Sequence, residues 1–197
     1  MDFTKVKENL AQAGFQVSCF ETAAAAADFL DNAIDGVTVG MGGSMSLEDM
    51  GIYQRLSKHN QVFWHWKTPG PETLAKAQTA KVYLSSVNAL AMSGEIVNID
   101  GTCNRVASMV YGHEQVYLVV GSNKIAQDYE SALFRARNVA APKNARRLNR
   151  QTPCALGEEK CYDCKSPDRI CKALSVLWQK PYGMECYVVL INEPLGY

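Results

Sequence analysis

Residues 85–124, SSVNALAMSGEIVNIDGTCNRVASMVYGHEQVYLVVGSNK, carry the pattern that decides the fold. Isoleucine and valine favour a strand at 95–99, with Glu95, Val97 and Ile99 on one face. The strand ends at Asp100-Gly101, and an apolar-periodic segment and a second apolar run at 116–120 follow. A helix that starts after such a turn has free backbone N–H groups, which hold small anions. We therefore predict an anion-binding corner at residues 100–105.

The corner offers acid–base groups and hydrogen-bond donors for a ligand. Glu95 or Asp100 would act as a general base or, in this fold class, as a nucleophile toward an activated acyl group, and Arg105 would clamp a carboxylate. In an alternative without a ligand, Asp100 makes an Asx-turn, Asn104 caps the helix and Arg105 pairs with Glu95 or Asp100. The asparagines expected to orient the ligand are Asn88, Asn98 and Asn104.

A glycine-rich bend at residues 40–44 is the second candidate contact. Gly42, Gly43 and Ser44 follow a predicted strand, and Ser46 is expected to cap the next helix. Ligands of open α/β sheets gather beyond the carboxyl ends of the strands, so this bend and the corner are expected to share one crevice. The alternative is a tight connection that binds nothing. Lys124, after the strand at 116–120, is either a further ligand contact or a solvated loop lysine.

The rest of the chain alternates helices with strands, which predicts an α/β fold with a mostly parallel sheet and helices on both faces. Two final strands, separated by residues 180–183, are expected to pair antiparallel at one edge. The predicted strands are 15–20, 36–39, 61–66, 82–86, 95–99, 116–120, 173–178 and 185–192. The predicted helices cover 3–13, 21–32, a segment after Ser46, 71–80, a segment after 104, 128–140 and 142–149.

Composition narrows the class of protein. The chain has 197 residues, 47% of them hydrophobic, and is expected to form a single domain over 1–197. Its 20 basic and 20 acidic residues cancel, which argues against a global attraction to DNA or membranes. The chain lacks an apolar run of about 20 residues and an apolar amino-terminal leader, so we expect a cytoplasmic protein, with homo-oligomerisation left open.

Four of the seven cysteines crowd into a loop at 151–172 with the spacing C-x6-C-x2-C-x6-C. Four thiolates around a C-x2-C pair can hold Zn²⁺ or an iron–sulfur cluster, and the neighbouring basic residues would stabilise the negative charge. Two disulfides or four reduced thiols are the alternatives. The predicted metal ligands are Cys154, Cys161, Cys164 and Cys171.

A basic segment at 135–150 contains six arginines and lysines and no acid. It would suit phosphates, an acidic partner subunit or RNA, but it lacks the interleaved aromatic residues typical of single-stranded nucleic-acid platforms. A solvated helix face is the alternative.

The quoted stretch, together with VGMGGSMSLEDMGI at 39–52, RARNVAAPKNARRLNRQTPC, CYDCKSPDRIC and NEPLGY, resembles the lactate-utilisation (LUD) domain family. The similarity covers essentially the whole chain and is closest to short single-domain members with a carboxy-terminal cysteine cluster. It implies a Rossmann-like fold similar to that of the NagB/RpiA/CoA-transferase superfamily. Two departures stand out, because Cys103 replaces an expected glycine, and 91–93 lack the usual threonine, glutamate and aspartate. The second departure weakens any acid–base role for Glu95.

Two functions are therefore predicted. In the first, the protein binds a small carboxylate or phosphate and works with partner subunits in oxidising lactate or a related hydroxy-carboxylate, a role that the resemblance implies. In the second, it is a non-catalytic interaction or electron-transfer module whose cysteine loop carries the metal.

Overall fold

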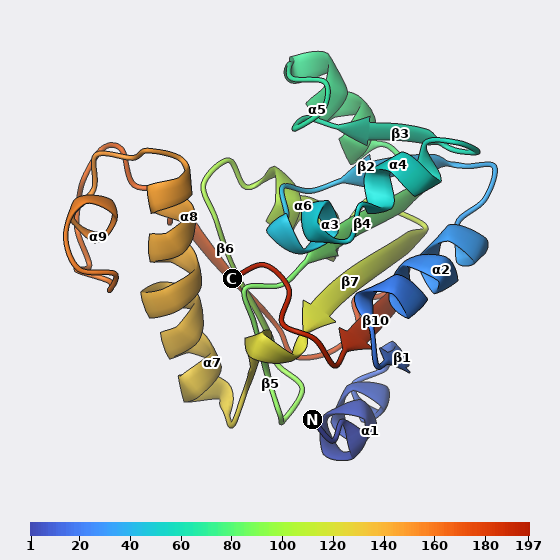
Figure 1. Ribbon diagram of the computed structural model, residues 1–197, viewed down its shortest axis with the longest axis horizontal. Helices are drawn as coiled ribbons and strands as arrows, with labels where there is room; N and C mark the ends of the chain where they lie inside the picture. Colours follow the sequence, from blue (N-terminus) through green and yellow to red (C-terminus); the bar gives the residue numbers. More distant parts are fainter.

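A six-stranded parallel sheet forms the centre of the structure, a computed structural model that describes residues 1–197 (Figure 1). The strands follow the order β1-β10-β7-β4-β2-β3, and each neighbouring pair is parallel. This confirms the predicted α/β class. The strands are β1 (Gln16–Phe20), β2 (Thr38–Met41), β3 (Gln61–Trp64), β4 (Val82–Ser86), β7 (Gln115–Gly121) and β10 (Glu185–Ile191).

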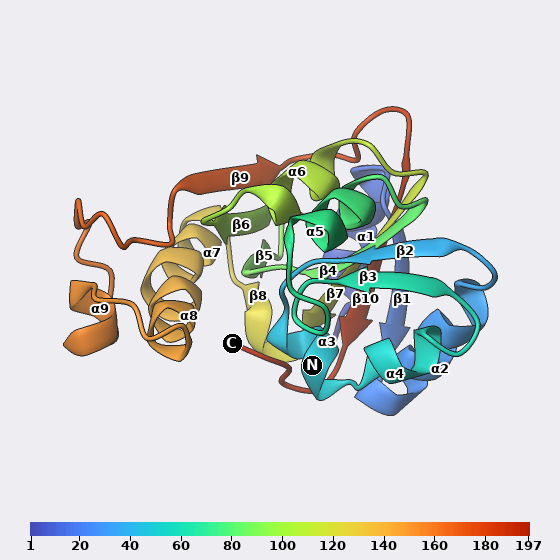
Figure 2. The ribbon, with the colours of Figure 1, turned by 90° about the horizontal axis from the view of Figure 1, so that it is seen from above.

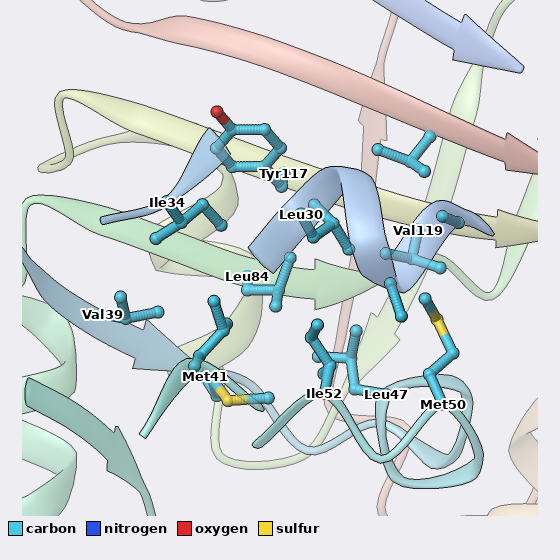
Figure 3. Packing of buried hydrophobic residues seen from close by; sticks show 14 of the residues in the cluster. Leu30, Ile34, Val39, Met41, Leu47, Met50, Ile52, Leu84, Tyr117 and Val119 are labelled. Carbon is cyan, nitrogen blue, oxygen red and sulfur yellow. The ribbon is translucent and has the colours of Figure 1, made fainter. Parts of the chain in front are cut away.

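One face of this sheet is covered by α2 (Ala23–Ala33), α3 (Met45–Asp49) and α4 (Ile52–Leu56). Alternate residues of each strand point toward these helices, as the twofold period of a strand requires. Leu30 of α2, for example, packs in the same cluster as Leu84 of β4 and Val119 of β7 (Figure 3). The buried cluster fixes the start of α3, and with it the glycine-rich bend.

The opposite face is covered by helices and by a second sheet. This four-stranded sheet has the order β8-β5-β6-β9, with β5 antiparallel to β6 and β6 antiparallel to β9. Leu90 and Ile96 join its inner face to Leu118 and Leu190 of the main sheet. The elements are α1 (Thr4–Gln12), α5 (Pro71–Gln78), α6 (Asn104–Val110), β5 (Ala89–Ala91), β6 (Ile96–Asp100), η1 (Ser122–Lys124), β8 (Ile125–Ala126) and β9 (Ala173–Leu177).

A long helix lies against the outer face of the second sheet (Figure 2). Val97 and Ile99 face its small residues Ala132 and Ala136, while Ile96 faces inward, which confirms the predicted alternation of β6. The helix has three parts: α7 (Tyr129–Arg135), a π-helical segment η2 (Ala136–Ala140) and α8 (Ala141–Arg147).

The π-helical segment has a local cause in the sequence. Pro142 has no N–H to donate to the carbonyl four residues earlier, so regular α-helical bonding cannot continue through this position. The π-helical turn accommodates the missing bond, so the helix runs on from the second sheet to the cavity described below. Residues 128–140 and 142–149, predicted as two pieces, form this one rod.

The two carboxy-terminal strands contradict the prediction that they pair with each other. β10 lies between β1 and β7 and is parallel to both, whereas β9 is antiparallel to β6 in the other sheet. The apolar run of β10 is buried on both faces, which is typical of a central parallel strand. The turn at 180–183 therefore crosses between sheets.

The segment between the long helix and β9 carries the cysteines. It contains one short helix, α9 (Pro153–Leu156), and otherwise irregular backbone that projects beside α8 (Figure 1). None of the helices has the length and apolar character needed to cross a lipid bilayer.

Candidate anion-binding site

The corner after β6 is closed by the carboxylate of Asp100. Its Oδ2 accepts hydrogen bonds from the backbone N–H groups of Arg105 (3.1 Å) and Val106 (3.1 Å) in the first turn of α6. A negative charge is favourable there because the start of a helix is electropositive. Asp100, and not Asn104, therefore supplies the cap. These two N–H groups are already bonded, so a ligand at the corner has to use other donors.

Arg105 is buried beneath the corner and holds its strands together. One terminal nitrogen donates to the carbonyl of Ser86 (2.9 Å) and to Asn98 Oδ1 (3.0 Å). The other donates to Asn88 Oδ1 (3.0 Å) and to the carbonyl of Ile99 (2.7 Å). All four N–H groups of these nitrogens thus point at protein acceptors. The geometry favours a positioning role for Arg105 over the predicted clamp on a ligand carboxylate.

The predicted meeting of the corner and the glycine-rich bend is present. Ser44 Oγ lies 2.6 Å from Ser86 Oγ, and residues from both segments line one cavity of about 460 Å³, which we call the corner cavity. The two glycines leave room for this packing, since a Cβ on Gly42 would lie 2.8 Å from Oη of Tyr83 and 3.0 Å from Cγ of Arg105. A Cβ on Gly43 would lie 3.0 Å from Nε1 of Trp66.

The residue that caps α3 is Ser44, and not the predicted Ser46. Ser44 Oγ accepts a hydrogen bond from the N–H of Leu47 (3.2 Å), which satisfies an orphan donor at the start of α3. Ser46 is buried, and its hydroxyl donates to the carbonyl of Leu195 (3.1 Å). The prediction of a Ser46 cap was therefore wrong by two residues.

The corner cavity lies beyond the carboxyl ends of five parallel strands, where α/β proteins usually bind their ligands. Ser44 follows β2, His65 follows β3, Ser86 ends β4, Lys124 follows β7 and Tyr197 follows β10. Basic side chains outnumber acidic ones in the lining. They are Arg105, Lys124, Arg147, Arg150, Arg169 and Lys172, against the acidic Asp100 and Asp168.

Several lining residues were not predicted from the sequence. The guanidinium of Arg147 lies over the ring of Trp66, 4.6 Å from its centroid, and its Nε donates to the hydroxyl of Tyr197 (2.8 Å). His65 Nδ1 is buried without a hydrogen-bond partner. Burial lowers the pKa of His65, although Asp100 opposes the shift, so its imidazole is neutral at neutral pH. The basic segment at 135–150 was the only sequence signal, and it contributes Arg147 and Arg150.

Some predicted site residues lie outside the cavity lining. Glu95 precedes β6, at the opposite end of the strand from Asp100, and accepts a hydrogen bond from Ser93. Gly42 and Asn98 pack behind the cavity around Arg105. The predicted residues that do line it are Gly43, Ser44, Asn88, Asp100, Asn104, Arg105 and Lys124.

The four predicted metal ligands, Cys154, Cys161, Cys164 and Cys171, line a neighbouring cavity of about 330 Å³. Arg137 Nη2 lies 3.7 Å from the sulfur of Cys161, and Arg169 Nε lies 3.3 Å from that of Cys171. All four thiols are free of disulfides. They share a cavity but do not converge, since no group of three or more cysteine, histidine or acidic side chains is close enough to hold a metal ion.

The parallel sheet with its basic cavity defines an α/β protein of the Rossmann-like class. The sequence model of the LUD domain matches residues 3–191, and the chain therefore belongs to the LUD domain family. Its fold is similar to that in the crystal structure of a DUF162 family protein from Deinococcus radiodurans, with a TM-score of 0.55 and 12% sequence identity. That similarity covers 95% of this chain and 94% of the other. No curated protein matches the chain.

Cys103 offers a direct test of the corner's backbone. Its φ of 68° lies in the left-handed region, which costs a residue with a side chain roughly 1–2 kcal/mol, whereas glycine adopts it freely. We expect Cys103→Gly to raise the free energy of unfolding by about 0.5–1 kcal/mol, after the greater entropy of glycine in the unfolded chain is subtracted. Urea denaturation followed by circular dichroism would measure the change. Cys103→Ala is the control and should give no gain, and an equal gain from both variants would contradict a backbone origin.

Proposed function

We propose that this LUD-family protein binds a small hydroxy- or keto-carboxylate in the corner cavity and takes part in oxidising lactate or a related hydroxy acid. The observation that carries the proposal is the surplus of basic side chains in a cavity beyond the strand ends. Arg147 supports it further, since no protein acceptor contacts its Nη1. That nitrogen is available for a carboxylate, with Asn104 and Ser44 as further polar partners.

The oxidation of a hydroxyl group to a carbonyl group requires a base that takes the hydroxyl proton. His65 suits this role because it lines the cavity and its imidazole is neutral. Asp100 is the second candidate base, since both of its hydrogen bonds use Oδ2 and leave Oδ1 without a donor. The carbon-bound hydrogen would leave with two electrons, formally as a hydride, to a redox group of a partner subunit in a lactate-oxidation system. Glu95 has no part in this scheme because of its distant position.

Titration calorimetry with L-lactate, pyruvate, inorganic phosphate and coenzyme A tests the proposal. Arg147→Ala should weaken binding of the carboxylate by about tenfold, near 1.4 kcal/mol, because a charged hydrogen bond is lost at a partly solvated position. Lys143→Ala is the matched control, since it removes a positive charge from the same helix but lies outside the cavity. If none of the four compounds binds the parent protein, the proposal fails.

A second candidate function rests on the cysteine cavity. We propose that Cys154, Cys161, Cys164 and Cys171 hold an iron–sulfur cluster or Zn²⁺ and that the loop serves electron transfer or docks a partner. The hydrogen bonds to sulfur support it, because Arg137, Arg169 and the backbone N–H of Asp163 (3.4 Å from Cys161 Sγ) would stabilise thiolates. The residues would have to draw together around the metal, as an irregular loop allows.

Elemental analysis and a visible spectrum of anaerobically purified protein test this second function. Brown protein with iron and sulfide would indicate a cluster, and colourless protein with stoichiometric zinc would indicate a structural site. Cys164→Ser should lose the metal, whereas Cys19→Ser, outside the loop, should retain it. Metal-free parent protein, or equal metal in both variants, would refute the assignment.

A further inference from the structure

Lys124 is a buried amine with no ionic partner. Its side chain is 3% exposed and reaches the corner cavity from the end of β7. Nζ donates one hydrogen bond, to Ser46 Oγ at 2.8 Å, and no carboxylate lies within ion-pair distance. A buried ammonium group with a single neutral partner is costly, and an apolar side chain would fill the same space more cheaply. The burial of Lys124 therefore indicates that its amine contacts a ligand rather than stabilising the fold.

The charged groups around Lys124 come from three elements. Arg135 of α7 and Arg105 of α6 repel a positive charge there, and Asp49 of α3 opposes them more weakly. Burial is the largest cause and, together with these arginines, lowers the pKa of Lys124 to about 7. At neutral pH, Lys124 is thus the neutral, nucleophilic amine in a substantial fraction of the molecules.

We propose that Lys124 forms an imine with the carbonyl carbon of a 2-oxo acid bound in the corner cavity. The inference rests on the proposed function, since it uses the same cavity, and it narrows the ligand to acids with a ketone or aldehyde carbon. The Nζ lone pair attacks that carbon to give a carbinolamine, and loss of water gives the imine. An amine and a carbonyl compound are converted into an imine and water, so no oxidant or reductant is required.

The surroundings of Lys124 fit this step. Ser46 Oγ accepts from Nζ while its own hydroxyl donates to the carbonyl of Leu195, which fixes the direction of the amine. The ligand carboxylate would bring the negative charge that this basic region lacks. It would point toward the exposed Arg147, and the carbonyl carbon would lie deeper, toward the buried Lys124.

Borohydride trapping tests the imine on the intact protein. Pyruvate followed by sodium borohydride should convert the imine into a stable secondary amine, seen by intact mass spectrometry as a single adduct of pyruvate minus water plus two hydrogens. Peptide mapping should place it on Lys124, and it should saturate over the concentration range of pyruvate binding. L-Lactate, which has no carbonyl carbon to attack, should give none.

Two variants separate Lys124 from other amines. Lys124→Met should abolish the adduct, whereas Lys143→Met, which removes a lysine outside the cavity, should leave it in place. Mapping in the parent protein keeps the test valid if Lys124→Met does not fold. Pyruvate binding in calorimetry without an adduct on Lys124, or an adduct on other lysines alone, would overturn the imine and leave the proposed function standing. Absence of binding by any carboxylate would overturn both.

Discussion

Replacing Arg105 with alanine should lower the free energy of unfolding by about 3–5 kcal/mol. The variant removes four hydrogen bonds at once and leaves buried acceptors on Asn88, Asn98 and two backbone carbonyls without a donor. Unpaired buried acceptors cost more than a hydrogen bond contributes on average, because they lose water without compensation. Urea denaturation followed by far-ultraviolet circular dichroism would measure the loss.

Two further variants define what the Arg105 result means. Arg105→Lys should recover little, because one ammonium group cannot reach four acceptors arranged for a planar guanidinium. Arg55→Ala removes a surface arginine that pairs with Asp28 and should cost no more than about 1 kcal/mol. If Arg105→Ala were nearly as stable as the parent protein but bound carboxylates far more weakly, Arg105 would be a ligand contact and its positioning role would be wrong.

Replacing Trp64 with alanine should cost a similar amount, about 3–5 kcal/mol, the range for deleting a buried aromatic side chain. Trp64 is 1% exposed, and its ring packs against those of Tyr53 and Trp66 at centroid distances of 5.8 and 5.4 Å. The guanidinium of Arg147 lies over the ring of Trp66, so losing the Trp64 ring beside it should also make the cavity wall less rigid. Thermal and urea denaturation would measure the stability, and calorimetry would measure any loss of anion affinity.

Trp178 provides the matched control because it is 73% exposed. Trp178→Ala should change the free energy of unfolding by less than about 0.5 kcal/mol. Trp64→Phe should lose much less stability than Trp64→Ala, since Nε1 of Trp64 is buried without a partner and its removal breaks no hydrogen bond. Equal losses in the alanine variants of the two tryptophans would contradict the assigned packing.

The sequence predicted the features that depend on local pattern. The period of β6 follows from its alternation of residues, and the shared crevice follows from the rule that ligand loops gather at the carboxyl ends of parallel strands. Asp100 and Arg105 were identified as important for the same reason, because they flank a strand-to-helix turn. Their roles differ from the first prediction, since hydrogen bonds to distant segments decide which atoms stay available.

The remaining features depend on contacts that no local pattern encodes. β10 had the apolar run of a central strand, but its position between β1 and β7 depends on which strands compete for the same edge. His65, Arg147 and Tyr197 meet in the cavity from three separate parts of the chain. Each has an ordinary local setting, and only the tertiary arrangement brings them together.

The π-helical segment has a consequence for how the cavity tolerates insertions and deletions. A π turn holds more residues than an α turn, so η2 sets the rotation of α8 about its own axis relative to α7. Deleting one residue there would turn everything downstream by about 100°. Asn144 and Arg147 would then swing out of the cavity, while Ala132 of α7 kept its contacts with the second sheet. The rotation of α8 about its axis thus decides whether the charge of Arg147 faces the ligand or the solvent.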